Sequence, residues 1–270
     1  MSATHDAFLG QLDKLLQARP EHAIARLFVP ADRRDAFSAI ECLVFELEQT
    51  LWHAREPQVA LAKLQWWGEE LQRSIEGAAR HPITQHLLPV RDADAAKIAA
   101  AHGMSAAMDF LDAGSVGDFA AQQAALAAFY SPLAQIETQY SGAGSGSGSP
   151  RALSFLLREL GRLSCGEAVH PLVTPLNLMA RHQLSRDALT REGEAREAFL
   201  RDQLQALSGV LSSHKAPADA GFAVRLRHRL DRRLAARAAA SPTPSQTMRA
   251  AVGVPATTAW HAWREARRGI

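Results

Sequence analysis

Apolar residues recur along the chain three and four positions apart, which is the spacing that places them on one face of an α-helix. Five of them predict a helix over about residues 32–54: Phe37, Ile40, Val44, Leu47 and Leu51. The next helix is expected to begin at Pro57, because proline suits the first turn of a helix. No segment alternates apolar and polar residues as a half-buried strand would, so the pattern predicts an all-α protein.

The same spacing and the turn-forming residues between the stripes predict the remaining helices. They are expected over residues 8–16, 57–75, 81–88, 92–111, 118–139, 151–163, 176–182 and 222–239. Ser185 is expected to be the N-cap of a further, long helix.

The stretch Ser141–Ser149 is almost entirely glycine and serine, a composition that cannot pack a core. We interpret it as a flexible loop within a single helical domain of residues 1–270; a domain boundary there is the alternative.

Composition supports the helical interpretation, because Ala, Leu and Arg are frequent and β-branched residues are few. Hydrophobic residues make up 47% of the chain, enough for a core, and the net charge of +2 gives no reason to expect a nucleic-acid partner. Without a leader-like N-terminus or a long apolar run, the chain is expected to be soluble and cytoplasmic. Cys42 and Cys165 are interpreted as buried thiols.

Adjacent tryptophans and an arginine-rich helix stand out from this background. Trp66 and Trp67 must point to different faces, one into the core and the other between helices. In residues 224–238 leucines line one face: Leu226, Leu230 and Leu234. The other faces carry Arg225, Arg229, Arg232 and Arg233. This helix is expected on the outside of the bundle, and the sharper alternative is peripheral contact with an anionic inner membrane surface.

Three segments resemble the squalene and phytoene synthase family. AKLQWWGEELQRSIEG (62–77), followed by His81-Pro82 and ITQHL, resembles the region of the family's third helix. PLNLMARHQLS (175–185) resembles the segment after its second aspartate motif, and ARLFVPADRRDAFSAI (25–40) resembles its opening. The resemblance covers about residues 20–240. It implies the isoprenoid-synthase helical bundle with a central cavity.

In that family two aspartate motifs on facing helices hold the Mg²⁺ ions that neutralise a prenyl diphosphate. The resemblance places the first motif at Glu48, Gln49 and Trp52, and the second at Glu159, Arg162 and Leu163, after a retained Arg158. Neither of the stretches Glu41–His53 and Ala152–Leu163, which carry these positions, contains an aspartate. Two further departures are Glu21-His22 at the family's Ser-Phe and AGSVGDF at its Arg-Tyr pair.

These replacements predict that tight Mg²⁺ binding is lost, with Glu48 and Glu159 as the remaining metal candidates. We expect a structural role for both acids. His53 is interpreted as a surface histidine near Glu56 and not as a catalytic base.

Two functional hypotheses follow from the resemblance. The first is a non-catalytic family member that binds a polyisoprenoid or lipid, or docks on a protein partner; family members that assist assembly of the respiratory NADH dehydrogenase complex are the precedent. The second is an active prenyltransferase that condenses two prenyl diphosphates head to head. It would use Mg²⁺ with Glu48, Glu159 and the pair Asp109 and Asp112.

Overall fold

The computed structural model describes residues 3–53, 56–112, 115–141, 148–214, 220–251 and 257–267. Within these ranges the chain is all helical and has no strand, as the apolar spacing predicts. The helices are α1 Ala3–Ala18, α2 Glu21–Leu27, α3 Arg34–Trp52, α4 Pro57–Ile75, α5 Ala93–Asp112, α6 Phe119–Ser141, α7 Ser149–Ser164, α8 Leu176–Arg181, α9 Arg186–Leu189, α10 Glu194–Ser213, α11 Phe222–Ala239, α12 Pro244–Ala250 and α13 Thr258–Ala266. Short 3₁₀ turns lie at Ala31–Arg33, Thr84–His86 and Pro171–Val173.

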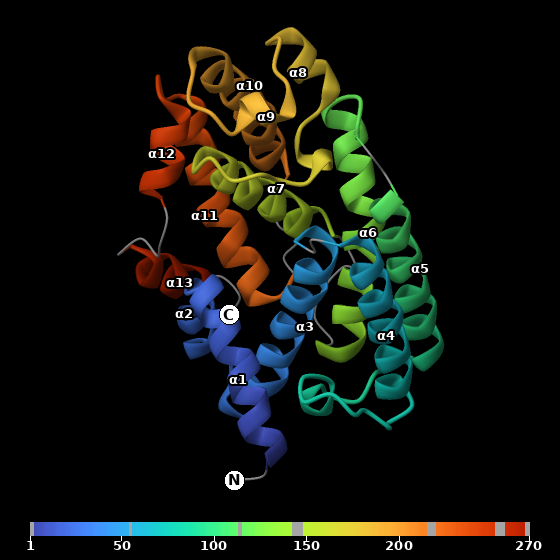
Figure 1. The fold of residues 1–270 in the computed structure, drawn as a ribbon. Helices are drawn as coiled ribbons and strands as arrows, with labels where there is room; N and C mark the ends of the chain where they lie inside the picture. Colours follow the sequence, from blue (N-terminus) through green and yellow to red (C-terminus); the bar gives the residue numbers. More distant parts are fainter. Residues whose placement is uncertain are drawn as a thin grey trace.

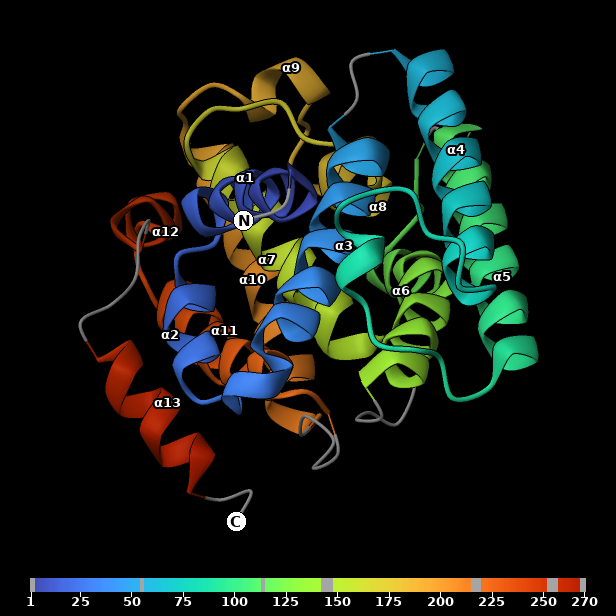
Figure 2. The same cartoon turned by 90° about the horizontal axis from the view of Figure 1, so that it is seen from below.

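Helix α7 is the central element (Figure 1), with α6, α10, α11 and α12 packed against it. It can be surrounded because apolar side chains project on more than one of its faces. Leu156 and Leu160 are fully buried, and Phe155 and Leu157 almost so. Helices α4, α5 and α6 pack in sequence at one edge of the molecule (Figure 2).

Helices α6 and α7 approach each other closely where α7 begins. A Cβ atom on Gly148, the N-cap residue of α7, would overlap the α6 backbone at Tyr130 and Ser131. Glycine is therefore required here by the distance between two backbones. The contact fixes the start of α7 and, with it, the side chains further along that helix.

The predicted helix over residues 81–88 is wrong, because the structure has only the short turn Thr84–His86 there. The cause is Glu70, whose buried carboxylate accepts hydrogen bonds from the backbone N–H groups of Arg80 and His81, both at 2.8 Å. The segment is thereby tied to α4. Its backbone leaves the helical region at Leu87.

Two other predicted boundaries also need correction. Ser185 does cap a helix, accepting a hydrogen bond from Ala188, but that helix is the single turn α9. The long helix α10 begins after Gly193. The predicted loop at 141–149 is too long, because Ser141 ends α6 and Ser149 begins α7; residues 142–147 lie outside the described residues.

None of the helices in the described part of the chain is both long enough and apolar enough to cross a membrane.

Candidate functional site

A cavity of about 610 Å³ lies between α3, α7, α11, α12 and the junction of α1 with α2. Its apolar wall comes from four of these elements and includes Phe45, Phe155, Leu157, Leu234 and Met248. Its polar wall is made of ionisable groups: Arg19, Glu21, Glu48, His53, Arg158, Glu159, Arg162, Glu167 and Arg227. The cavity therefore combines a lipophilic surface with a dense set of opposite charges.

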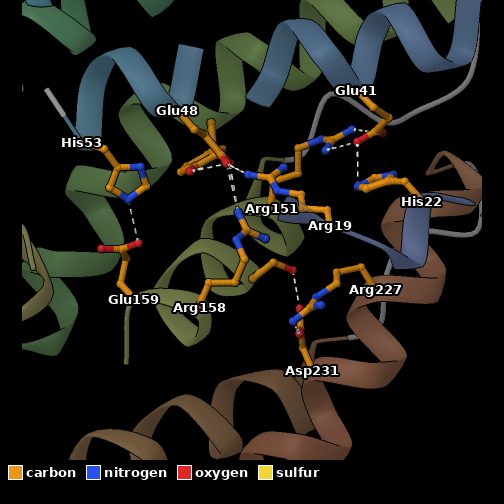
Figure 3. Close-up of polar contacts among 12 residues, drawn as sticks. Arg19, His22, Glu41, Glu48, His53, Arg151, Arg158, Glu159, Arg227 and Asp231 are labelled. Carbon is orange, nitrogen blue, oxygen red and sulfur yellow. Dashed lines mark hydrogen bonds and ion pairs between the residues drawn. The ribbon is translucent and has the colours of Figure 1, made fainter. Parts of the chain in front are cut away.

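Glu48 of α3 is held by two arginines from different parts of the chain (Figure 3). Arg19 forms an ion pair with its Oε2 atom, and Arg158 Nη2 lies 3.0 Å from the same oxygen. The hydroxyl of Tyr130 donates a hydrogen bond of 2.8 Å to Oε1. Both carboxylate oxygens of Glu48 are thus engaged by protein groups.

These contacts keep Glu48 ionised although its side chain is buried. Burial raises the pKa of a carboxyl group, but the charges of Arg19 and Arg158 and the Tyr130 hydrogen bond bring the pKa of Glu48 below its usual value. Burial and the neighbouring carboxylate raise the pKa of Tyr130, which keeps its donor proton in place.

Glu159 of α7 also lines the cavity, and its carboxylate is likewise in contact with two basic side chains. His53 Nε2 lies 3.0 Å from its Oε1 atom, and Arg162 Nη1 lies 3.2 Å from its Oε2 atom. Arg162 also contacts Glu167 at 2.9 Å. Because Arg158 and Glu159 are consecutive, α7 contacts both Glu48 of α3 and His53, the residue that follows α3.

A second set of buried charges lies beside the cavity. Arg151 of α7 contacts Glu41 of α3 at 2.7 Å and Glu137 of α6 at 2.9 Å. His22 Nε2 lies 3.6 Å from Glu41. Burial raises the pKa of Glu41, but Arg151 and His22 lower it more, to about 2.

Arg227 of α11 completes the polar wall. Its Nη1 atom lies 3.0 Å from Glu21 and its Nη2 atom lies 2.6 Å from Asp231. Asp231 also accepts a short hydrogen bond from Ser154 of α7. Glu21 and His22, the pair that stands at the family's Ser-Phe position, therefore lie at the cavity or next to it.

Four of the six positions taken from the two aspartate motifs come together at the cavity, and two do not. Glu48, Gln49, Glu159 and Arg162 line the cavity. Trp52 is instead buried among the rings of Phe110, Phe129 and Phe155, and Leu163 is also in the core. Two of the positions thus serve packing.

Glu48 and Glu159 are the acids among the motif positions, and both line the cavity. Mg²⁺ is usually held in octahedral geometry by one or two carboxylates together with water and substrate phosphates. Among the described residues no group of three or more His, Cys, Asp and Glu side chains is placed to hold a metal ion. Glu48 and Glu159 meet basic side chains at the oxygens that an ion would require.

Several other sequence-based interpretations are corrected. Trp67 is buried as expected, but Trp66 is 40% exposed and does not sit between helices. Cys42 is buried, whereas Cys165 is exposed and lines the cavity. Asp109 is exposed on α5 and does not line the cavity; the side chain of Asp112 lies outside the described part. His53 is partly buried, with 24% of its side chain exposed, and contacts Glu159.

Sequence reasoning missed Arg19, Tyr130 and Arg227 as members of the site. Arg19 follows the end of α1 and precedes Pro20, where nothing in the local pattern distinguishes it from a solvated arginine. Arg227 lies in the Arg-rich stretch that predicted an outer helix. Only the packing of α1, α6 and α11 around α3 and α7 reveals their roles.

The helices around this cavity define the class of the fold: it is the all-helical fold of head-to-head prenyl synthases. The structure is similar to that of a dehydrosqualene synthase crystallised in complex with ligand, with a TM-score of 0.67 and 9% sequence identity, over 98% of this chain and 96% of that one. It is also similar to the squalene synthase HpnC from Alicyclobacillus acidocaldarius, with a TM-score of 0.52 and 15% identity, over 85% of this chain and 93% of that one. No protein-family model and no curated protein matches the sequence. The isoprenoid-synthase-like fold expected from the three segments is confirmed.

Proposed function

We propose that this chain is a squalene/phytoene-synthase-like protein that binds an isoprenoid or a similar lipid in its cavity and does not ionise prenyl diphosphates. The observation that carries the proposal is the engagement of Glu48 and Glu159. Each acid stands at an expected metal-binding position, and each is in contact with two basic side chains.

The energetics of buried charge support this proposal. A magnesium ion could reach Glu48 only by separating it from Arg19 and Arg158, leaving guanidinium groups in the cavity wall without their counter-ion. Breaking a buried pair in this way costs about 3–5 kcal/mol. The incoming ion would also be repelled by the same arginines.

The size and lining of the cavity favour a lipophilic ligand. Its volume of about 610 Å³ lies within the range of roughly 300–1,000 Å³ that is usual for small-molecule sites. Phe45, Phe155 and Leu234 give it apolar walls contributed by three helices. A prenyl chain would bury its apolar surface there, which is the main favourable term for such a ligand.

The competing hypothesis is an active prenyltransferase with an altered metal site. It would rely on the same Glu48 and Glu159, because Asp109 is not at the cavity. A protein-docking role, for example in assembly of a larger complex, is a further form of the non-catalytic hypothesis. For all of these roles we propose the cytoplasm as the place of action.

Binding can be tested with the purified protein and a fluorescent farnesol analogue. Ala251 lines the cavity, so Ala251→Trp should fill its mouth and weaken binding at least tenfold. The exposed neighbour Ala250 does not line it, and Ala250→Trp should leave binding unchanged. Equal binding by both variants would place the ligand elsewhere.

Catalysis is tested by incubating the protein with labelled farnesyl or geranylgeranyl diphosphate and Mg²⁺. We expect no release of pyrophosphate and no heat of Mg²⁺ binding in calorimetry with a diphosphate analogue. Turnover that Glu48→Gln or Glu159→Gln abolishes would refute the non-catalytic role. A pull-down that recovers a specific, stoichiometric protein would support the docking role instead.

A further inference from the structure

Helix α13 is attached to the rest of the molecule through one of its faces. Glu265 contacts Arg225 at 3.3 Å and Arg229 at 2.6 Å, both on α11. His261 is bonded to Arg233, and Ala262 is fully buried in a small apolar cluster with residues of α2 and α11. This face is therefore fixed, and the helix cannot rotate without breaking ion pairs and apolar contacts.

The opposite face presents two tryptophans. Trp260 is 54% exposed and Trp263 is 38% exposed, and their rings stack with centroids 4.9 Å apart and an interplanar angle of 23°. The guanidinium of Arg267 lies over the ring of Trp263, 4.2 Å from its centroid. Positions 260, 263 and 267 share one side of a helix. They form the Trp face, which we define as Trp260, Trp263, Arg264 and Arg267.

The charge of the Trp face is positive. The acid that α13 carries among its described residues is Glu265, and this side chain is turned to α11. Arg233, which is exposed beside His261, adds a further positive charge next to the helix. Among the described residues of α13, two partly exposed indole rings are thus flanked by arginines and share their side of the helix with no acid, an arrangement that suits a partner both apolar and anionic.

A membrane interface has that chemistry. Indole rings favour the region between head groups and acyl chains because their carbons are apolar and their N–H can donate. Arginines extend toward the phosphates while their stems stay among apolar groups. Acidic phospholipids attract such basic side chains over about a Debye length.

The Arg-rich helix α11, which the sequence singled out for this role, is less suited to it. Arg225 and Arg229 face Glu265, and Arg227 faces Glu21 and Asp231. These arginines hold α13 and the cavity wall in place. The surface suited to a bilayer lies two helices further along the chain, on α13.

We propose that the Trp face of α13 docks on the surface of an anionic phospholipid bilayer, with the two indole rings inserted at the interface. This contact does not depend on the ligand of the cavity, so it stands or falls separately from the proposed function. It is weak and reversible, since two rings and a few charges provide far less than a spanning helix.

The test is flotation of the full chain with vesicles of phosphatidylcholine containing about a third phosphatidylglycerol. Wild type should float, and the double variant Trp260→Ser/Trp263→Ser should lose at least tenfold in partitioning. Trp66→Ser is the matched control, because Trp66 on α4 is exposed to 40% and should not contribute. Circular dichroism melting should show that all three proteins are folded.

The electrostatic part has its own variant. Arg264→Gln/Arg267→Gln should weaken partitioning about 25-fold, since each arginine near an anionic surface contributes a factor of about five, or ~1 kcal/mol. Binding of wild type should fall with added salt and be weak on pure phosphatidylcholine. Brominated lipids should quench wild-type fluorescence but not that of the Trp260→Ser/Trp263→Ser variant.

Three results would overturn the proposal. One is equal flotation of wild type and the Trp260→Ser/Trp263→Ser variant, and another is an equal loss caused by Trp66→Ser. The third is self-association in sedimentation that the Trp260→Ser/Trp263→Ser change abolishes while vesicle binding persists. That result would assign the Trp face to a second copy of the chain.

Discussion

Glu48 on α3 and Arg158 on α7 form an ion pair in which Arg158 Nη2 lies 3.0 Å from Glu48 Oε2. It joins two helices at the positions where both aspartate motifs were expected. The motif positions thus contribute an attraction between α3 and α7, whereas two clusters of acids would repel each other without metal ions between them.

Replacing Glu48 should therefore destabilise the fold. In Glu48→Gln the guanidiniums of Arg19 and Arg158 lose their counter-ion, and we expect a loss of about 3 kcal/mol in the free energy of unfolding. Urea denaturation measures it. Glu46→Gln on the same helix is the control and should change stability by less than about 0.5 kcal/mol. Equal effects of the two changes would argue against a special role of Glu48.

The coupling between Glu48 and Arg158 can be isolated in a double-mutant cycle. For Glu48→Gln with Arg158→Gln we expect an interaction of about 2 kcal/mol, because Glu48 is buried. The exposed pair Arg26 and Asp35, whose side chains are 3.0 Å apart, should give roughly 0.2–1 kcal/mol in the same analysis. An interaction energy of zero between Glu48 and Arg158 would show that this ion pair is not formed in solution.

Acid should weaken the second charge cluster through Glu41. Its pKa is lowered from 4.5 to about 2, so folding favours the ionised form. This contribution is complete above about pH 4.5 and is lost as the pH falls toward 2. The pKa of buried His22 is also lowered, so this group too reduces the free energy of unfolding as the pH falls below about 6.5. The pKa of Glu137 is raised, so its protonation in acid favours the folded state and partly offsets the two losses.

The measurement is the urea midpoint as a function of pH for wild type and Glu41→Gln. Glu41→Gln should be less stable at pH 7, and the difference should narrow as the pH falls below 4.5. A constant difference at every pH would mean that Glu41 titrates normally. Glu46→Gln again serves as the control and should follow wild type.

The close approach of α6 and α7 gives a packing prediction. Gly148→Ala should lower the free energy of unfolding by about 3 kcal/mol or more. The new methyl group would overlap backbone atoms of α6, which cannot move aside as the end of a side chain can. Gly209 lies at an exposed position in the C-terminal part of α10, with no atom near its Cβ position. Gly209→Ala should therefore stabilise the protein by about 1 kcal/mol. Thermal melting of both variants checks the contrast.

The helices that were predicted well are those with a long apolar stripe. Helix α11 begins and ends at the predicted residues, and α4 begins at Pro57 as predicted. The segment 81–88 failed because Glu70, at least ten positions away, binds its backbone N–H groups. Local spacing carries no information about such a contact.

The sequence pointed to two acids that line the cavity, but not to the groups that contact them. The family resemblance located Glu48 and Glu159, and the structure brings both to one cavity. The partners of Glu48 could not be found, because Arg19 lies 29 positions before it and Arg158 lies 110 positions after it. Two arginines among many become recognisable only when the fold places them on the same carboxylate.

The polar wall of the cavity has a consequence for how a ligand would come and go. Arg19, Arg158, Arg162 and Arg227 are matched in number by Glu21, Glu48, Glu159 and Glu167. A pyrophosphate group would meet cations that are already neutralised, whereas an uncharged terpenoid would release no counter-ions on entry. The rates at which such a molecule enters and leaves the cavity would then depend on how it partitions between water and lipid, and they would not change with ionic strength.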